Sequence, residues 1–150
     1  MSAQVEITAR LAGFFGVLAV MTLDKDLAAR TVIGDYTINR QTRELDRLCH
    51  AFVARHLPSA GHLRYVSAVL RLDIALERIG DYAATISRTV AQLSTQPPAV
   101  VVRDIQTMSE NASRTLQDAL RSFQQRDVDL AQATATRSGL LTTAAESSGI

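Results

Sequence analysis

The sequence is poor in residues that build covalent or rigid structure: 150 residues contain one cysteine, three prolines, seven glycines and no tryptophan. With Cys49 alone, neither an intrachain disulfide nor a cysteine-based zinc cluster can form. We interpret Cys49 as a small buried apolar side chain, and we expect a cytoplasmic location. The 16 basic and 15 acidic residues nearly cancel, without a basic cluster interleaved with aromatics. This balance argues against nucleic acid as a partner.

One apolar run, LAGFFGVLAVMT at residues 11–22, resembles the core of a signal peptide. It is shorter than the roughly 20 apolar residues that span a bilayer. The preceding segment carries Glu6 and only one basic residue, Arg10, and no small-x-small cleavage site follows. We therefore expect this run to form a buried first helix.

The scarcity of glycine and proline leaves long stretches rich in helix-forming residues. Pro58 and the Pro97-Pro98 pair interrupt them, because proline cannot continue a helix. A chain of this size with 47% apolar residues can bury one core. These features predict an all-α, up-down antiparallel helical bundle. The expected helices cover residues 3–22, 25–56, 59 or 60 to 93, 102–124 and 128–143.

Apolar residues three and four apart predict which helix faces are buried. In the third expected helix the seam is Val69, Leu72, Leu76, Ile79, Ala83, Ile86 and Val90. In the second, a weaker seam is Leu27, Thr31, Ile38, Leu45, Leu48 and Phe52.

Three carboxylates, Asp73, Glu77 and Asp81, follow one another at four-residue intervals beside the seam of the third expected helix. We expect them outside the core, where each like-charged pair would cost about 0.2–0.5 kcal/mol. Asp35 and Asn39 occupy the equivalent heptad positions in the preceding helix. Oxygen ligands of this kind suit Mg, Ca, Mn or Fe, and Zn less well. The alternative is an ordinary solvated helix face.

No catalytic set is present in the sequence. The three histidines, His50, His56 and His62, recur every six residues and therefore point in different directions around a helix. There is no Gly-rich phosphate loop, no GxSxG elbow and no Glu-x-x-His pattern of the kind that di-metal oxidases use. We expect a protein that is not an enzyme.

A short internal echo joins the two halves of the chain. The segment LDKDLA at residues 23–28 recurs as RDVDLA at residues 126–131, although Asp35 is replaced by Ser138 at the equivalent place. The echo predicts the start of a second repeat that lacks the acids of the first.

The segment LRLDIALERIGDYAATISR, residues 70–88, resembles the signature helix of the PhoU family, which carries ERIGDxAxNI or a close variant. The similarity extends over most of residues 11–135. It implies a bundle of the PhoU type, with one complete three-helix repeat over residues 1–95, a Pro-containing linker over residues 96–103 and a partial second repeat over residues 104–150.

The resemblance also implies a function. Glu77 and Asp81 match the family's metal-holding E/D-x-x-x-D motif in one helix, and Asp35 with Asn39 matches the motif of the preceding helix, so a surface ion such as Mg, Mn, Fe or Zn is implied. Proteins of this family regulate phosphate uptake and phosphate-starvation signalling. The implied partners are the ATPase subunit of a phosphate ABC transporter and a phosphate-sensing histidine kinase, with a second copy in a homodimer.

The sequence departs from the family pattern at three places. His62 replaces an acid, Asn39 supplies no charge and Thr85 replaces the usual asparagine. Two alternatives therefore remain open. One is a helical adaptor or oligomerisation module without metal or phosphate-system partners, and the other is a di-metal carboxylate enzyme.

Overall fold

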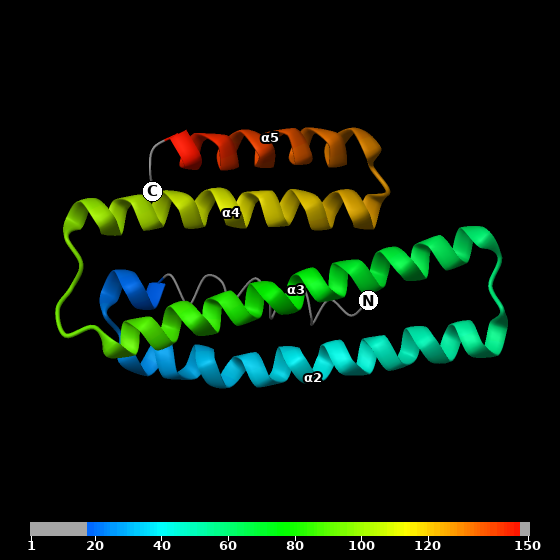
Figure 1. Cartoon of the computed structure of the whole chain (residues 1–150), viewed down its shortest axis with the longest axis horizontal. Helices are drawn as coiled ribbons and strands as arrows, with labels where there is room; N and C mark the ends of the chain where they lie inside the picture. The colour runs from blue at the N-terminus through cyan, green and yellow to red at the C-terminus, as the bar shows by residue number, and fades with distance from the viewer. Residues whose placement is uncertain (1–17, 148–150) are drawn as a thin grey trace. The chain divides into compact units, whose positions relative to one another are not determined.

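The computed structural model describes residues 18–147, with side chains described as far as residue 139. The described residues are helical, with short connections between the helices (Figure 1). The helices are α2 (Lys25–His56), α3 (Ala60–Gln92), α4 (Ala99–Gln125) and α5 (Val128–Ser147). Residues 18–22 are also helical, as expected for the end of the first predicted helix, whereas residues 3–17 lie outside the described residues. No described helix is long and apolar enough to cross a membrane.

The helix ends follow the local chemistry of the sequence. Asp24 caps α2, its side chain accepting a hydrogen bond from the Leu27 amide at 2.9 Å. Pro58 separates α2 from α3, as predicted. The fourth helix begins at Ala99, three residues earlier than expected, directly after Pro98. The carbonyl of Pro98 accepts the Val102 amide, so the proline provides the first acceptor of α4.

The chain divides into two compact units, residues 1–105 and 106–150. In the first unit, α2 and α3 pack antiparallel (Figure 1). A small apolar cluster at one end of this hairpin consists of Ala19, Val20, Ala28 and Val90, with Leu23, Leu27 and Ile105 packed against it. The boundary between the units lies inside α4, so it does not coincide with the predicted linker over residues 96–103, and the predicted division into repeats stays a prediction.

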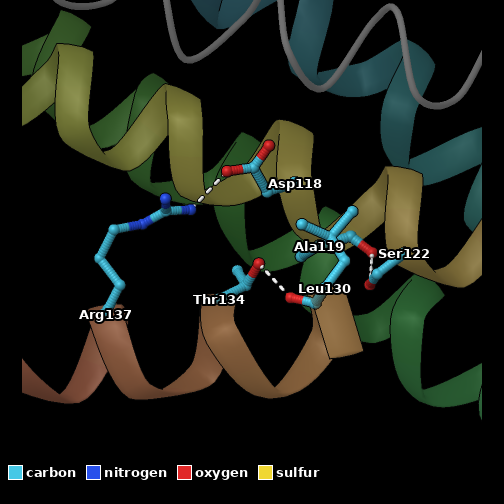
Figure 2. Close-up of polar contacts among 6 residues, drawn as sticks. All are labelled: Asp118, Ala119, Ser122, Leu130, Thr134 and Arg137. Atoms are coloured by element: carbon cyan, nitrogen blue, oxygen red, sulfur yellow. Dashed lines mark hydrogen bonds and ion pairs between the residues drawn. The ribbon is translucent and has the colours of Figure 1, made fainter. Parts of the chain in front are cut away.

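In the second unit, α5 runs back along α4 (Figure 1). Arg137 on α5 forms an ion pair with Asp118 on α4, and within α5 the Thr134 hydroxyl donates to the Leu130 carbonyl at 2.7 Å (Figure 2). Leu120 of α4 is fully buried. The Arg137–Asp118 ion pair therefore links two helices that follow one another directly in the sequence.

The turn before α5 repeats the turn before α2. Leu23 and Arg126 both have a positive φ, of 52° and 55°. Asp127 caps α5 through the Leu130 amide at 2.9 Å, as Asp24 caps α2. The geometry matches wherever the LDKDLA and RDVDLA segments align, which confirms the internal echo.

The repeat continues one turn further than the sequence match. The hydroxyls of Thr31 and Thr134 are both buried, and each donates to the carbonyl of the leucine four residues earlier. The amides of Asp24 and Asp127 both reach back five residues, to Ala19 and Ser122 carbonyls at 3.2 and 2.9 Å. These contacts extend the repeat beyond the two six-residue segments, and the contact to Ala19 is matched at Ser122 although the two residues differ.

The α2 and α3 helices approach one another tightly at Gly80. A Cβ built there would lie 2.9 Å from Cδ1 of Ile38 and 3.1 Å from Oδ1 of Asp35. Both residues are buried, and Ile38 has no exposed surface. Their side chains therefore have little room to withdraw, and glycine is needed here for close helix approach and not for a special backbone angle.

We predict that Gly80→Ala lowers the free energy of unfolding by about 1–2 kcal/mol, because overpacking a tight contact outweighs the better helix propensity of alanine. Chemical denaturation measures the change. Gly34→Ala in α2 is the matched control, since a Cβ there meets nothing within 4 Å. The control should gain up to about 1 kcal/mol. Equal shifts in the two variants would contradict the close contact at Gly80.

Candidate functional site

The buried face of α3 is a regular seam with residues alternately four and three apart. Its members are Val69, Asp73, Leu76, Gly80, Ala83, Ser87 and Val90, all buried. The facing seam of α2 also alternates, through Ala28, Thr31, Asp35, Ile38, Thr42 and Cys49, again all buried. We call these two faces together the polar seam, because most of their members are small or polar.

The predicted seams shared several positions with the observed ones but missed the polar members. Leu72 and Ile79 are only half-buried, and Ile86 is 38% exposed. On α2, Leu48 is 51% and Phe52 40% exposed. The prediction was therefore wrong at these residues. The helices turn Asp73, Gly80 and Ser87 inward in their place, because small side chains allow the helix axes to approach.

The sequence predicted that Asp73, Glu77 and Asp81 lie on one stripe outside the core. The structure does not place all of these carboxylates there. Asp73 is buried, with 2% of its surface exposed, and Asp35 is buried at 9%. Glu77 is half-buried and only Asp81 is exposed. The expectation that these acids lie outside the core was wrong for Asp73 and Asp35, since both occupy seam positions between the helices.

Asp35 lies beside Gly80 at the tight contact between α2 and α3. Its Oδ2 accepts a hydrogen bond from the Asn39 amide nitrogen at 3.2 Å, and its Oδ1 has no hydrogen-bond partner. Burial raises the pKa of Asp35, and the Asp81 carboxylate raises it further, whereas Arg88 and the Asn39 amide act in the opposite direction. The site thus brings together three of the predicted residues, Asp35, Asn39 and Asp81.

Asp73 forms the second acidic position of the polar seam. Burial raises its pKa to about 6, and the Glu77 and Asp46 carboxylates act in the same direction. Thr42 Oγ1 makes no hydrogen bond of normal geometry, so its opposing effect on the pKa of Asp73 is that of a nearby hydroxyl dipole. Oδ1 of Asp73 also has no partner. A largely desolvated carboxyl group with an unpaired oxygen is costly for the fold.

Cys49 lies in the same part of the polar seam. It is buried and free of disulfides, as predicted. Burial raises the pKa of its thiol, and the Asp73 and Asp46 carboxylates add to this effect. The thiol therefore stays protonated and inert, which agrees with its interpretation as a small apolar side chain.

Within the part of the chain that the structure describes, no three His, Cys, Asp or Glu side chains gather closely enough to hold a metal ion. The five predicted ligands divide into one group around Asp35 and another around Asp73. A hard cation needs about six oxygen ligands, although Mg²⁺ often takes only one or two carboxylates and keeps several waters. Metal binding by these residues stays a prediction.

Sequence reasoning gave no role at all to two buried polar members of the polar seam, Thr42 and Ser87. Both are buried, and their hydroxyl oxygens have no hydrogen-bond partner. Neither carries a charge or belongs to a motif. The signal that could have revealed Ser87 is its seven-residue spacing from Gly80 and Asp73, which puts three small or polar residues at the same heptad position.

The fold and the polar seam define an all-α helical-bundle protein in which the α2–α3 pair buries carboxyl groups. A family model described as "PhoU domain" matches residues 17–90, which include the whole polar seam up to Val90. The chain belongs to the PhoU family, as its sequence indicated. The fold class predicted from sequence is confirmed by the same comparison and by the solved structure described next.

A crystal structure of PhoU from Pseudomonas aeruginosa is similar to this chain with a TM-score of 0.87 and 26% identity, covering 93% of this chain and 68% of that one. A phosphate-specific transport system accessory protein PhoU of Edwardsiella tarda is 31% identical over 75% of this chain and 46% of its own length. An Aquifex aeolicus homolog of that name is 33% identical over 71% and 48%. The chain spans about half the length of the curated relatives that it matches.

We predict that the free energy of unfolding falls as the pH rises from about 4 to about 6.5. Asp73 is protonated in both states at low pH. An unfolded chain releases this proton near the ordinary value of 3.8, whereas the folded chain holds it up to about 6. The folded state therefore binds more protons in this window, and stability declines by about 2 kcal/mol across it.

Denaturant unfolding at a series of pH values measures this decline, and Asp73→Asn should flatten most of it. The control is Asp104→Asn, which removes an exposed carboxylate from α4 and should leave the pH profile unchanged. If Asp73→Asn and the wild type show the same pH profile, the carboxyl group of Asp73 ionises in the folded chain as it does in water.

Proposed function

We propose that this chain is a PhoU-like regulator of phosphate uptake and phosphate-starvation signalling that works by binding other proteins and not by turnover. The observation that carries the proposal is the match over nearly the whole chain to a solved PhoU structure, together with relatives named as accessory proteins of phosphate-specific transport. An accessory role needs a stable surface and no reaction centre.

The proposed partners are the ATPase subunit of a phosphate ABC transporter and a phosphate-sensing histidine kinase, met on the cytoplasmic side of the membrane. A second copy of the chain is the proposed partner in a homodimer. The exposed acidic end of the motif helix supports a binding surface of this kind. There Asp81 and Tyr82 are solvent-exposed, and Arg78 donates a hydrogen bond to the Tyr82 hydroxyl at 3.0 Å and lies over its ring. Tyrosine and arginine are enriched where proteins bind one another.

We predict that the full chain captures the ATPase subunit or the kinase in a pulldown, and that Asp81→Arg reduces capture at least about tenfold by placing like charge against a complementary surface. The control is Glu110→Arg, which reverses an exposed acid on α4. Both variants must retain the wild-type circular dichroism spectrum.

Capture of neither partner by the wild type would contradict the proposal and favour the helical adaptor that keeps the fold alone. A phosphate-starvation reporter in cells expressing the chain separates the two readings further. The regulator changes reporter output, and Asp81→Arg abolishes the change, whereas an unrelated adaptor leaves the output the same.

We also propose that Glu77 and Asp81 bind a divalent or iron-type metal ion. The other predicted ligands are Asp35, Asn39 and Asp73. The unpaired Oδ1 atoms of Asp35 and Asp73 support this proposal, because an orphaned buried carboxylate oxygen is a free ligand. Two carboxylates with bound water form the weak kind of site that Mg²⁺ accepts.

Metal analysis of protein purified under metal-replete conditions tests this site. We predict a bound ion that Glu77→Ala and Asp81→Ala each remove, and that Glu44→Ala leaves in place. Glu44 is a suitable control because it is an exposed acid of α2 that pairs with Arg47. If the purified wild-type protein contains no metal, the proposal is wrong and these acids form an ordinary helix face.

A further inference from the structure

Charge is strongly segregated along the α2–α3 hairpin. The chain carries no Asp or Glu from residue 47 to residue 72, a segment that we call the hairpin tip. The hairpin tip holds all three histidines of the chain and four of its arginines: Arg47, Arg55, Arg64 and Arg71. Arg47 is paired with Glu44, but Arg55 and Arg64 have no ion-pair partner among the described residues.

Apolar side chains are exposed on the same hairpin tip. Leu57, in the connection between the helices, is 85% exposed, and Leu63 on α3 is 48% exposed. Leu48 and Phe52 lie one turn apart on α2 and are also exposed. The hairpin tip thus has an apolar apex with arginines on both flanks, at the closed end of the hairpin (Figure 1).

The backbone holds Leu57 at the apex. This residue has φ 41° and ends α2, with its amide donating to the Val53 carbonyl at 3.1 Å. Glycine is the usual residue at such a left-handed helix end, because a side chain is disfavoured there. A large apolar residue at this position, almost wholly exposed, adds nothing to the packing of the hairpin.

We propose that the hairpin tip docks on an anionic lipid bilayer, with Leu57 and its apolar neighbours entering the interface and Arg55 and Arg64 contacting lipid phosphates. This inference goes beyond the proposed regulatory function and does not depend on it. Charge complementarity carries it, since the hairpin tip presents unpaired cations and no carboxylate that an anionic surface would repel. Arginine stems can cover apolar surface while their guanidinium groups stay with the phosphates.

The shape of the hairpin tip favours a bilayer over an acidic protein. Its exposed apolar residues project from two helices and from the connection between them, so they surround a convex end and do not form one flat face. A bilayer interface adapts around a convex apolar element, whereas a protein would need a groove matched to it. Shallow apolar insertion combined with basic residues is the usual pattern of reversible surface binding.

Vesicle flotation of the full chain tests the proposal. The probes are vesicles of phosphatidylcholine alone and of phosphatidylcholine mixed with phosphatidylglycerol. We expect the chain to float with the mixed vesicles only, and added salt to weaken binding because it screens the arginines. The double variant Arg55→Glu with Arg64→Glu should lower the partition coefficient at least about tenfold. Leu57→Gly should lower it several-fold while keeping the helix end intact, because glycine suits this backbone conformation.

Matched controls lie on α2, outside the hairpin tip. Arg30→Glu with Arg40→Glu changes the net charge by the same amount, and Ile33→Ser removes an apolar side chain that is 73% exposed. Both controls should bind mixed vesicles as the wild type does. Equal loss in the controls and the hairpin tip variants overturns the proposal, and so does equal binding to neutral vesicles.

A second probe separates the bilayer from an acidic protein. Polyglutamate in solution offers the same negative charge without an apolar interior. If the chain binds polyglutamate through Arg55 and Arg64 but does not float with mixed vesicles, the hairpin tip is a site for an acidic protein and the bilayer proposal is wrong. Flotation that depends on Leu57 as well as on the arginines supports the bilayer.

Discussion

The close approach of α2 and α3 at Gly80 is the contact on which the rest of the first unit depends. Glycine at this position leaves room for Ile38 and Asp35 of α2, because a Cβ there would lie 2.9 Å from Cδ1 of Ile38 and 3.1 Å from Oδ1 of Asp35. The same approach brings Asp35 against the backbone of α3. The glycine of the ERIGDY motif thus has a packing role that its neighbours in the motif do not share.

Burying carboxyl groups between these helices costs free energy of hydration and raises the pKa values of the buried groups. Asp35 and Asp73 lose hydration, and each keeps one oxygen without a hydrogen bond. Burial and neighbouring acids push the pKa of both groups upward, so the helix pair is more stable when they are protonated. Replacing a buried charged group by apolar residues of similar volume is often neutral or stabilising, so these acids are weak evidence for the stability of the hairpin.

Much of the architecture could be read from the sequence because it depends on local signals. Prolines and an Asp cap determine where α2 and α3 begin and end, and the observed bounds of both helices agree with the predicted ones. The polar seam could not be read in the same way. Val69, Leu76, Ala83 and Val90 belong to two possible seams, and hydrophobicity alone favours the one that adds Leu72, Ile79 and Ile86. The observed seam adds Asp73, Gly80 and Ser87 because helix separation, and not hydrophobicity, decides between them.

The arrangement of charge also differs between the two parts of the α2–α3 hairpin. Acids can be tolerated in the polar seam near Asp35 and Asp73 because small residues and hydroxyl groups surround them and their raised pKa values reduce the charge that is buried. From residue 47 to residue 72, on both sides of the connection, the chain carries no acid. One end of the hairpin is therefore organised by buried carboxyl groups and the other by exposed arginines and leucines. Exposed Asp81 on α3 and the exposed arginines of the hairpin tip are therefore separate positions of opposite charge on one helix pair.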